Sequence, residues 1–171
     1  MRSAGVVCLA LWMLAVGAAS GQSVTAVPKL DEKLFATGWY EIARLPNKPE
    51  KKWVSNALQM YTVGNKPWQF QVVESCLLKD GEANVRNLSG RGDKVGDGRL
   101  KLGSFPFATK TWVLATAPDY SWALVGSPNH KLLWILSRTA TMDEAVLQQV
   151  EGTAAAQGYK VDKLQRVVQG K

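Results

Sequence analysis

Two segments decide the fold: TGWYEIARLPN at residues 37–47 and LWILSRT at residues 133–139. Both are rich in the β-branched and aromatic residues that favour strands. The large indole of Trp39 can close one end of a barrel, and the guanidinium of Arg138 can stack on it while bonding carbonyls at strand ends. We therefore expect Trp39 and Arg138 to form a structural barrel base rather than to contact a ligand.

The N-terminal residues predict a cleavable signal peptide over residues 1–21. Arg2 gives a positive start, an apolar run follows over residues 6–16, and small residues come next. This run is shorter than the roughly 20 apolar residues that a membrane span needs. The sequence therefore predicts an exported protein, secreted or periplasmic, with a mature domain over residues 22–171.

Cysteine content and charge narrow the class of protein further. Cys8 would leave with the signal and is badly placed for a lipid anchor, so Cys76 would have no disulfide partner. Loss of Arg2 changes the net charge from +7 to +6. The basic residues are spread along the chain, which favours a solvated surface over nucleic-acid binding and leaves weak contact with an anionic membrane surface open. The sequence also leaves the oligomeric state open.

Strand signals dominate the mature chain. Short connections such as Asp80-Gly81 favour antiparallel pairing of neighbours in sequence order. The pattern predicts an all-β fold, an eight-stranded antiparallel up-and-down β-barrel with one C-terminal α-helix and a short following strand. The expected strands cover residues 39–45, 56–63, 68–77, 83–91, 99–104, 110–116, 120–126, 132–138 and 160–167.

One segment has a helical period. Residues 141–144 fit a capping box that starts at Thr141, and Gly158 can end the helix. Apolar residues at spacings of three and four lie between them, at Leu147, Val150 and Ala154. Residues 22–33 are expected to be a flexible lead-in.

Three ordered motifs resemble the lipocalin family, above all apolipoprotein D and the bacterial outer-membrane lipocalins. They lie at residues 39–47, at residues 112–125 and at residues 133–139, and the resemblance covers nearly the whole mature chain. One departure is that the family's glycine two residues before the tryptophan is Thr37 here, while Gly38 directly precedes Trp39, so the entry into the first strand can follow another path. The resemblance implies a calyx for an apolar ligand and no enzymatic activity.

Alternation along the strands and the resemblance together give a candidate ligand site. Phe70, Val72 and Glu74 share one face of their strand, and the resemblance turns this face inward. Such a lining suits a fatty acid or a lysophospholipid. Core packing remains the alternative for the tryptophans and Met60. For Glu74 the alternative is a solvated position or an ion pair with a neighbouring basic residue. The predicted ligand-binding residues are Ala43, Leu58, Met60, Phe70, Val72, Glu74, Trp112, Leu114, Trp134 and Leu136.

Other features leave few routes to catalysis. With His130 as the single histidine and Cys76 as the single mature cysteine, we expect no metal site, no cofactor and no catalytic triad. The rival hypothesis is an enzyme on a lipocalin-like barrel that uses Glu74 or a tyrosine as acid or base. An enzyme would require several polar side chains to converge inside the calyx. A third hypothesis is a purely structural or membrane-surface partner with a filled barrel. Trp53, in the basic loop between the first two strands, either packs on the rim or meets an amphipathic ligand or a bilayer.

Overall fold

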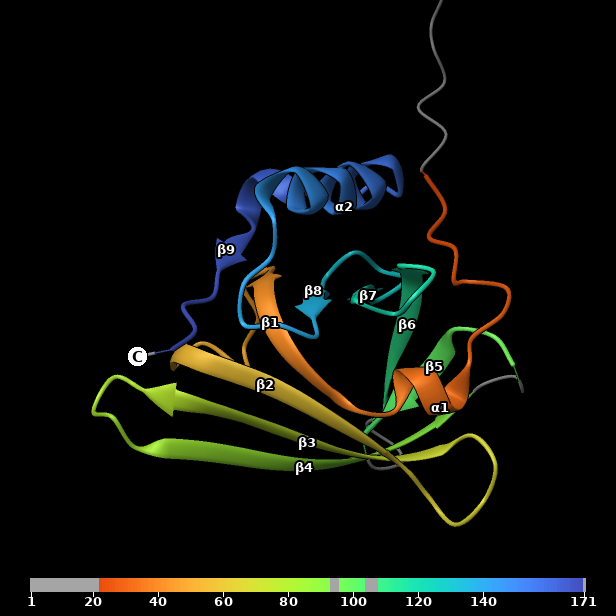
Figure 1. Ribbon diagram of the computed structural model, residues 1–171, viewed down its shortest axis with the longest axis horizontal. Coiled ribbons are helices and arrows are strands. Elements are labelled where there is room, and N and C mark those ends of the chain that lie inside the picture. Colours follow the sequence, from red (N-terminus) through yellow and green to blue (C-terminus); the bar gives the residue numbers. More distant parts are fainter. Residues whose placement is uncertain (1–21, 93–95, 104–107, 171) are drawn as a thin grey trace, which may run out of the picture.

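The computed structural model describes residues 22–92, 96–103 and 108–170 (Figure 1). The predicted signal peptide at residues 1–21 lies outside the described residues. Eight antiparallel strands close into a barrel and one long helix, α2 (Glu144–Ala156), lies against its outside, which confirms the predicted fold class. The strands are β1 (Gly38–Arg44), β2 (Trp53–Val63), β3 (Gln69–Leu78), β4 (Ala83–Gly92), β5 (Arg99–Leu102), β6 (Thr109–Thr116), β7 (Trp122–Gly126), β8 (Leu133–Ser137) and the short β9 (Gln165–Arg166).

The barrel closes through β1. From β2 to β8 each strand pairs with the next in sequence, while β1 pairs with β2 at its start and with β8 along its length. Trp39 lies opposite Gln59 of β2, and Arg44 lies opposite Trp134 of β8. The end of β1 also pairs with β9, which lies outside the eight-stranded barrel.

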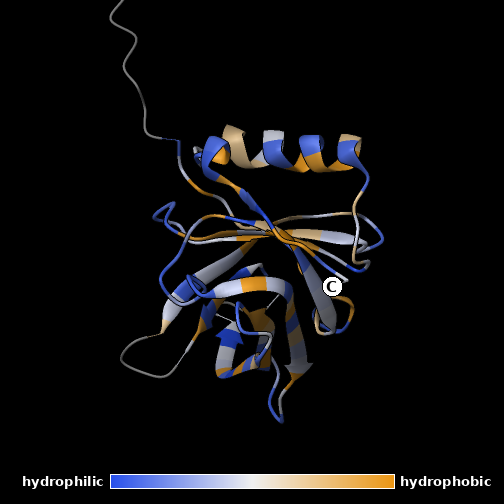
Figure 2. Cartoon of the chain, turned by 90° about the vertical axis from the view of Figure 1, so that its left-hand side faces the viewer, coloured by the Kyte–Doolittle hydropathy of each residue, from blue (hydrophilic) through white to orange (hydrophobic). Residues whose placement is uncertain are grey.

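Two apolar layers stabilise this arrangement. The inner layer fills the lower barrel around Trp39, and the outer layer lies between the barrel and α2. Leu147, Val150 and Ala154 of α2 are buried, so the predicted helical face is confirmed, and Figure 2 shows α2 stretched across one side of the barrel. No helix in the described part of the chain is long and apolar enough to cross a bilayer.

The segment before β1 is ordered, so the expectation of a flexible lead-in over residues 22–33 was wrong. Val27 exchanges backbone hydrogen bonds with Val113 and Gly98, and Leu30 donates to Gly96. A short helix, α1 (Glu32–Phe35), follows, and Phe35 is fully buried under the barrel. The polar composition of the segment hid these backbone contacts with distant strands.

The C-terminal helix α2 starts two residues later than the predicted capping box implied. Asp143, not Thr141, caps α2, because its carboxylate accepts from the amides of Ala145 and Val146. Gly158 follows the helix with a positive φ of 86°, as its role as a stop requires. The expected last strand is shorter, since a 3-10 turn, η1 (Val161–Lys163), precedes β9.

The C-terminal tail joins β1 and β2 where these strands separate. Val167 donates to the Ile42 carbonyl on β1, and Asn56 of β2 donates to the Val168 carbonyl. The side-chain amide of Gln169 then donates to the carbonyls of Glu41 and Ala57, at 2.8 and 3.0 Å. One side chain therefore bridges both edges of the gap.

Replacing Gln169 with alanine should lower the free energy of unfolding by about 1–2 kcal/mol, because two partly buried carbonyls lose their donor. Urea denaturation would measure it. Gln148→Ala, on the exposed side of α2, is the control and should change stability by less than about 0.5 kcal/mol. Equal effects of the two substitutions would show that the tail does not join the strands.

Candidate functional site

The base of the barrel is closed by Trp39 and Arg138. The guanidinium carbon of Arg138 lies 3.3 Å from the centre of the Trp39 ring, and the buried indole donates to the Phe35 carbonyl at 3.0 Å. Arg138 donates to the carbonyls of Tyr120 and Gly38, each at 3.0 Å, and to that of Leu34. Burial lowers the pKa of Arg138 to about 10, so it stays charged at neutral pH.

This arrangement confirms the predicted geometry of the base. Arg138 lies at the end of β8, Trp39 lies near the start of β1, and α1 covers them from below. The guanidinium bonds three different segments while it stacks on the indole, so the pair holds these segments together across the end of the barrel.

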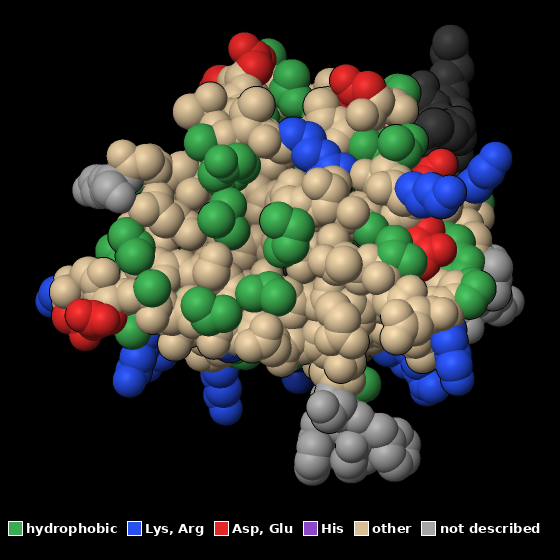
Figure 3. Space-filling model, turned by 60° about the horizontal axis from the view of Figure 1, so that its bottom comes forward, with side chains coloured by type: hydrophobic (Ala, Val, Ile, Leu, Met, Phe, Trp, Pro, Cys, Tyr) green, Lys and Arg blue, Asp and Glu red, His purple; other side chains and the backbone are tan. Residues whose placement is uncertain are grey.

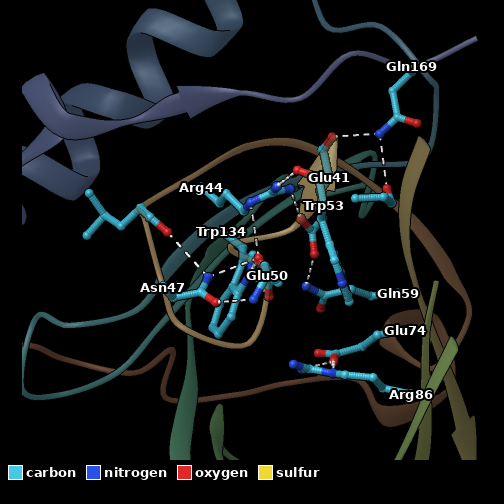
Figure 4. A network of polar contacts seen from close by, with 12 residues as sticks. Glu41, Arg44, Asn47, Glu50, Trp53, Gln59, Glu74, Arg86, Trp134 and Gln169 are labelled. Carbon is cyan, nitrogen blue, oxygen red and sulfur yellow. Dashed lines mark hydrogen bonds and ion pairs between the residues drawn. The ribbon is translucent and has the colours of Figure 1, made fainter. Parts of the chain in front are cut away.

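The upper half of the interior holds a buried polar cluster (Figure 4). Arg44 donates to Glu41 at 3.0 Å and to the Trp53 carbonyl at 3.1 Å, and its Nε lies 3.2 Å from Glu50. Glu41 also accepts from Gln59 at 2.8 Å, and the Tyr61 hydroxyl donates to Gln59 at 2.9 Å. We call Glu41, Arg44, Glu50, Gln59, Tyr61, Glu74 and Arg86 the mouth cluster.

Glu74 forms a third ion pair of the mouth cluster, with Arg86. Its carboxylate accepts from Nε of Arg86 at 2.9 Å and from a second nitrogen of that guanidinium. Trp53 lies between the two arginines, with its ring centre 5.2 Å from the guanidinium of Arg86 and 5.9 Å from that of Arg44. Trp53 is therefore a buried rim residue, which matches the packing interpretation of the basic loop.

The balance of charge in the mouth cluster favours one bound proton. Three carboxylates, of Glu41, Glu50 and Glu74, face two guanidiniums, of Arg44 and Arg86. Burial and the nearby Glu50 carboxylate raise the pKa of Glu41 to about 8, against the opposing effects of Gln59 and Arg44. Burial also raises the pKa of Glu74, with Arg86 opposing it. A single proton on Glu41 makes the cluster neutral.

This proton should make stability depend on pH. Because the pKa of Glu41 is about 8 in the folded chain and 4.5 as its reference value, the folded protein holds the proton over this window. The free energy of unfolding should therefore fall by on the order of 2–3 kcal/mol between pH 5.5 and pH 8.5. Urea denaturation across this range should show the slope in the native chain and a much flatter profile in Glu41→Gln. A Glu41→Gln variant with the native slope would contradict the assignment.

Five of the ten predicted ligand residues point into the barrel. Phe70, Val72, Trp134 and Leu136 belong to the inner apolar layer, and Glu74 is buried in the mouth cluster. The predicted inward face of β3 is therefore correct. Glu74 forms an ion pair with Arg86, which is the alternative role that we considered for this residue. Ligand contact by any of these five residues stays a prediction.

Leu58 and Met60 lie on the outside of β2, so their predicted inward orientation was wrong. Ala57, Gln59 and Tyr61 are buried instead, while Met60 is 48 % exposed. The strand turns its polar Gln59 inward because Glu41 and Tyr61 satisfy it there. Hydrophobic side chains consequently appear on the surface that Figure 3 shows, with lysines and arginines projecting along its edge.

Ala43, Trp112 and Leu114 also face away from the interior, which corrects three more predicted orientations. All three pack in the outer layer below α2. Both faces of β6 and β8 are covered, one by the interior and one by α2, so apolar alternation could not choose between them. Bulges in β1 after Glu41 and in β6 after Val113 shift the alternation further.

An open pocket borders the mouth cluster, beside the loop between β1 and β2 and next to β9, which lies outside the barrel. It has a volume of about 400 Å³ and is lined by Arg44, Pro46, Asn47, Lys48, Glu50, Lys51 and Gln165. Three of these residues are basic and one is acidic, so the pocket offers a net positive surface. In the described residues no group of three or more potential metal-ligating side chains comes together.

Six residues of the mouth cluster were not predicted from the sequence: Glu41, Arg44, Glu50, Gln59, Tyr61 and Arg86. For Glu41 a signal existed, because it stands two residues after Trp39 and therefore shares its inward face. Gln59 and Tyr61 share a face in the same way. Glu50 carried no such signal, since it lies in a loop and its partner Trp134 is 84 residues away.

Comparisons with known proteins agree with this geometry. Residues 30–169 match the family model of the lipocalin-like domain. Temperature-induced lipocalin-1 of Arabidopsis thaliana is 29% identical over 157 residues, covering 86% of this chain and 84% of that protein. Outer membrane lipoprotein Blc of Citrobacter freundii is 32% identical over 147 residues, covering 84% and 81%.

Solved structures share the fold. Insecticyanin of the tobacco hornworm Manduca sexta superimposes with a TM-score of 0.69 at 22% identity, covering 86% of this chain and 85% of that one. Lobster apocrustacyanin A1 gives a TM-score of 0.66 at 22% identity, covering 82% and 81%. With the closed base, the barrel and the family match together, this chain belongs to the lipocalin family, whose members generally bind small hydrophobic ligands.

Proposed function

We propose that this protein binds and carries one amphipathic lipid, a fatty acid or a lysophospholipid, with the acyl chain inside the barrel and the polar end at the mouth. The observation that carries this proposal is the division of the interior along its axis. Phe70, Val72 and Leu136 belong to the apolar lower layer, whereas the mouth cluster supplies charged groups above them. An amphipathic lipid has the same division.

The energetics of chain burial suit such a ligand. Each buried methylene contributes about 0.8 kcal/mol, so twelve would supply on the order of 10 kcal/mol before the costs of association. The apolar layer then provides the affinity, and the mouth provides the orientation of the ligand.

We also propose that the protein is exported from the cytoplasm by its N-terminal signal peptide. Residues 1–21 have the pattern of a signal peptide. The Blc relatives are named outer membrane lipoproteins, which fits a secreted or periplasmic location. The basic residues Lys48, Lys51 and Lys52 near the mouth would favour weak contact with an anionic membrane surface.

A lipocalin-like enzyme is the second candidate, because several polar side chains do converge inside the barrel and the pKa of Glu41 is raised. The hydrogen bonds favour a carrier. Both carboxylate oxygens of Glu41 are occupied, one by Gln59 and one by Arg44. Glu74→Gln should accordingly keep acyl-chain binding, whereas an enzyme that used Glu74 would lose turnover.

The experiment is native mass spectrometry of the protein after incubation with palmitic acid or a palmitoyl lysophospholipid. Two matched variants locate the lipid: Val72→Phe narrows the interior, and Met60→Phe adds the same ring outside the barrel. We expect the interior variant to bind at least about tenfold more weakly and the outer variant to bind normally. No retained lipid, or equal loss in both variants, would overturn the proposal.

A further inference from the structure

Glu50 lies in a site built from three donors. Its carboxylate oxygens lie 3.0 and 3.2 Å from the indole nitrogen of Trp134, and Oε2 also lies 2.9 Å from Nδ2 of Asn47 and 3.2 Å from Nε of Arg44. The side chain is only 2% exposed although it comes from the loop between β1 and β2. In Figure 4 Asn47, Arg44 and Trp134 surround it.

The three donors match a carboxylate in charge and in direction. They come from β1, from the loop and from β8, so they converge on one point from separate segments. Arg44 supplies an ion pair, and the indole N–H spans both oxygens of the carboxylate. This donor set would recognise any carboxylate of similar reach.

The site borders the open pocket beside the loop between β1 and β2. Lys48 and Lys51 line that pocket together with Arg44 and Glu50. An anion that arrives from solution therefore meets two lysines before it reaches the donors. A neutral lipid gains nothing from this path.

We infer that this three-donor site is the carboxylate-binding subsite for the ligand, and that Glu50 fills it as a built-in competitor when no ligand is bound. The inference rests on the proposed carrier function and narrows the ligand to a lipid with a free carboxylate, a fatty acid. When the carboxylate of the fatty acid replaces that of Glu50, Arg44 keeps an ion-pair partner, so its buried guanidinium is never left unpaired.

The first test is Glu50→Gln with palmitic acid and hexadecanol as probes. The amide keeps the size of the side chain and removes the charge that competes for Arg44. We expect palmitic acid to bind roughly tenfold more tightly, since one ion pair no longer has to be exchanged, and hexadecanol to change less than about twofold. Glu82→Gln is the control, because it removes the same charge from an exposed hairpin and should change neither affinity.

The second test removes a donor. Trp134→Phe keeps an aromatic ring in β8 and deletes the indole N–H that contacts Glu50. Combined with Glu50→Gln, it should weaken palmitic acid binding by roughly three- to tenfold more than it weakens hexadecanol binding, each compared with Glu50→Gln alone. Palmitoyl lysophosphatidylcholine, which has no carboxylate, should follow hexadecanol in both variants.

The native chain gives an independent readout. Lys51 and Lys52 follow Glu50 in the loop, so release of Glu50 should speed tryptic cleavage there when palmitic acid is added and not when hexadecanol is added. This measurement decides the matter even where Glu50→Gln does not fold. Unchanged or slower cleavage with palmitic acid, or equal shifts for acid and alcohol, would overturn the subsite alone. Failure of every probe to bind the native chain would instead overturn the carrier function.

Discussion

Replacing Arg44 with alanine is expected to lower the free energy of unfolding by about 3–5 kcal/mol at pH 7.5, because it leaves buried carboxylates without their guanidinium. Glu50 would lose its ion pair, and Glu41 and the Trp53 carbonyl would each lose a hydrogen-bond donor. Guanidinium chloride denaturation, followed by circular dichroism, would measure the loss.

Arg166→Ala provides the matched control for this prediction. Arg166 also pairs with two carboxylates, of Glu144 and Glu151, but it is half exposed at the surface. Its removal should cost less than about 1 kcal/mol. A double variant, Arg44→Met with Glu50→Gln, should recover part of the stability that Arg44→Met loses, because it removes the carboxylate that Arg44 pairs with. Equal costs for Arg44→Ala and Arg166→Ala would show that the mouth cluster is not buried in solution.

Trp39→Ala has the second large expected effect, about 3–5 kcal/mol, since it empties the volume of a fully buried indole at the barrel base. The substitution also removes the ring below Arg138 and the hydrogen bond to the Phe35 carbonyl. Urea denaturation of the variant is the measurement.

A tryptophan in the outer layer serves as the comparison for Trp39. Trp122 is only partly buried, against the layer under α2, so Trp122→Ala should cost about 1–2 kcal/mol. If Trp39→Ala cost no more than Trp122→Ala, the indole at position 39 would not be the closure of the barrel.

The barrel base could be predicted from sequence because its chemistry is local and specific. An indole at the start of one strand and a guanidinium at the end of another suffice to suggest the stack that the structure shows at 3.3 Å. The inward face of β3 was also predictable, since alternation separates Phe70 and Val72 from the glutamines at 69 and 71, and the family resemblance turns the first of these faces inward.

The prediction of which side chains point inward was wrong where both faces of a strand are buried. Trp112 and Leu114 lie on β6, whose outer face is covered by α2, and Ala43 follows a bulge in β1. The predicted orientation of Leu58 and Met60 was wrong for a different reason, because β2 buries a polar residue. Their strand buries Gln59 against Glu41, a residue 18 positions away, so polarity along β2 is the reverse of what an apolar interior predicts.

The proposed carrier holds an acyl chain inside the barrel with its polar end at the mouth. A crystal structure of the complex with ω-bromopalmitic acid would locate this chain, because the anomalous signal of bromine marks its end. We predict one bromine peak inside the barrel beside Phe70, Val72 and Leu136, with the carboxylate at Arg44 and Trp134. A bromine peak on the outer face of β2 and β3, or a carboxylate in the interior with the bromine at the mouth, would contradict it.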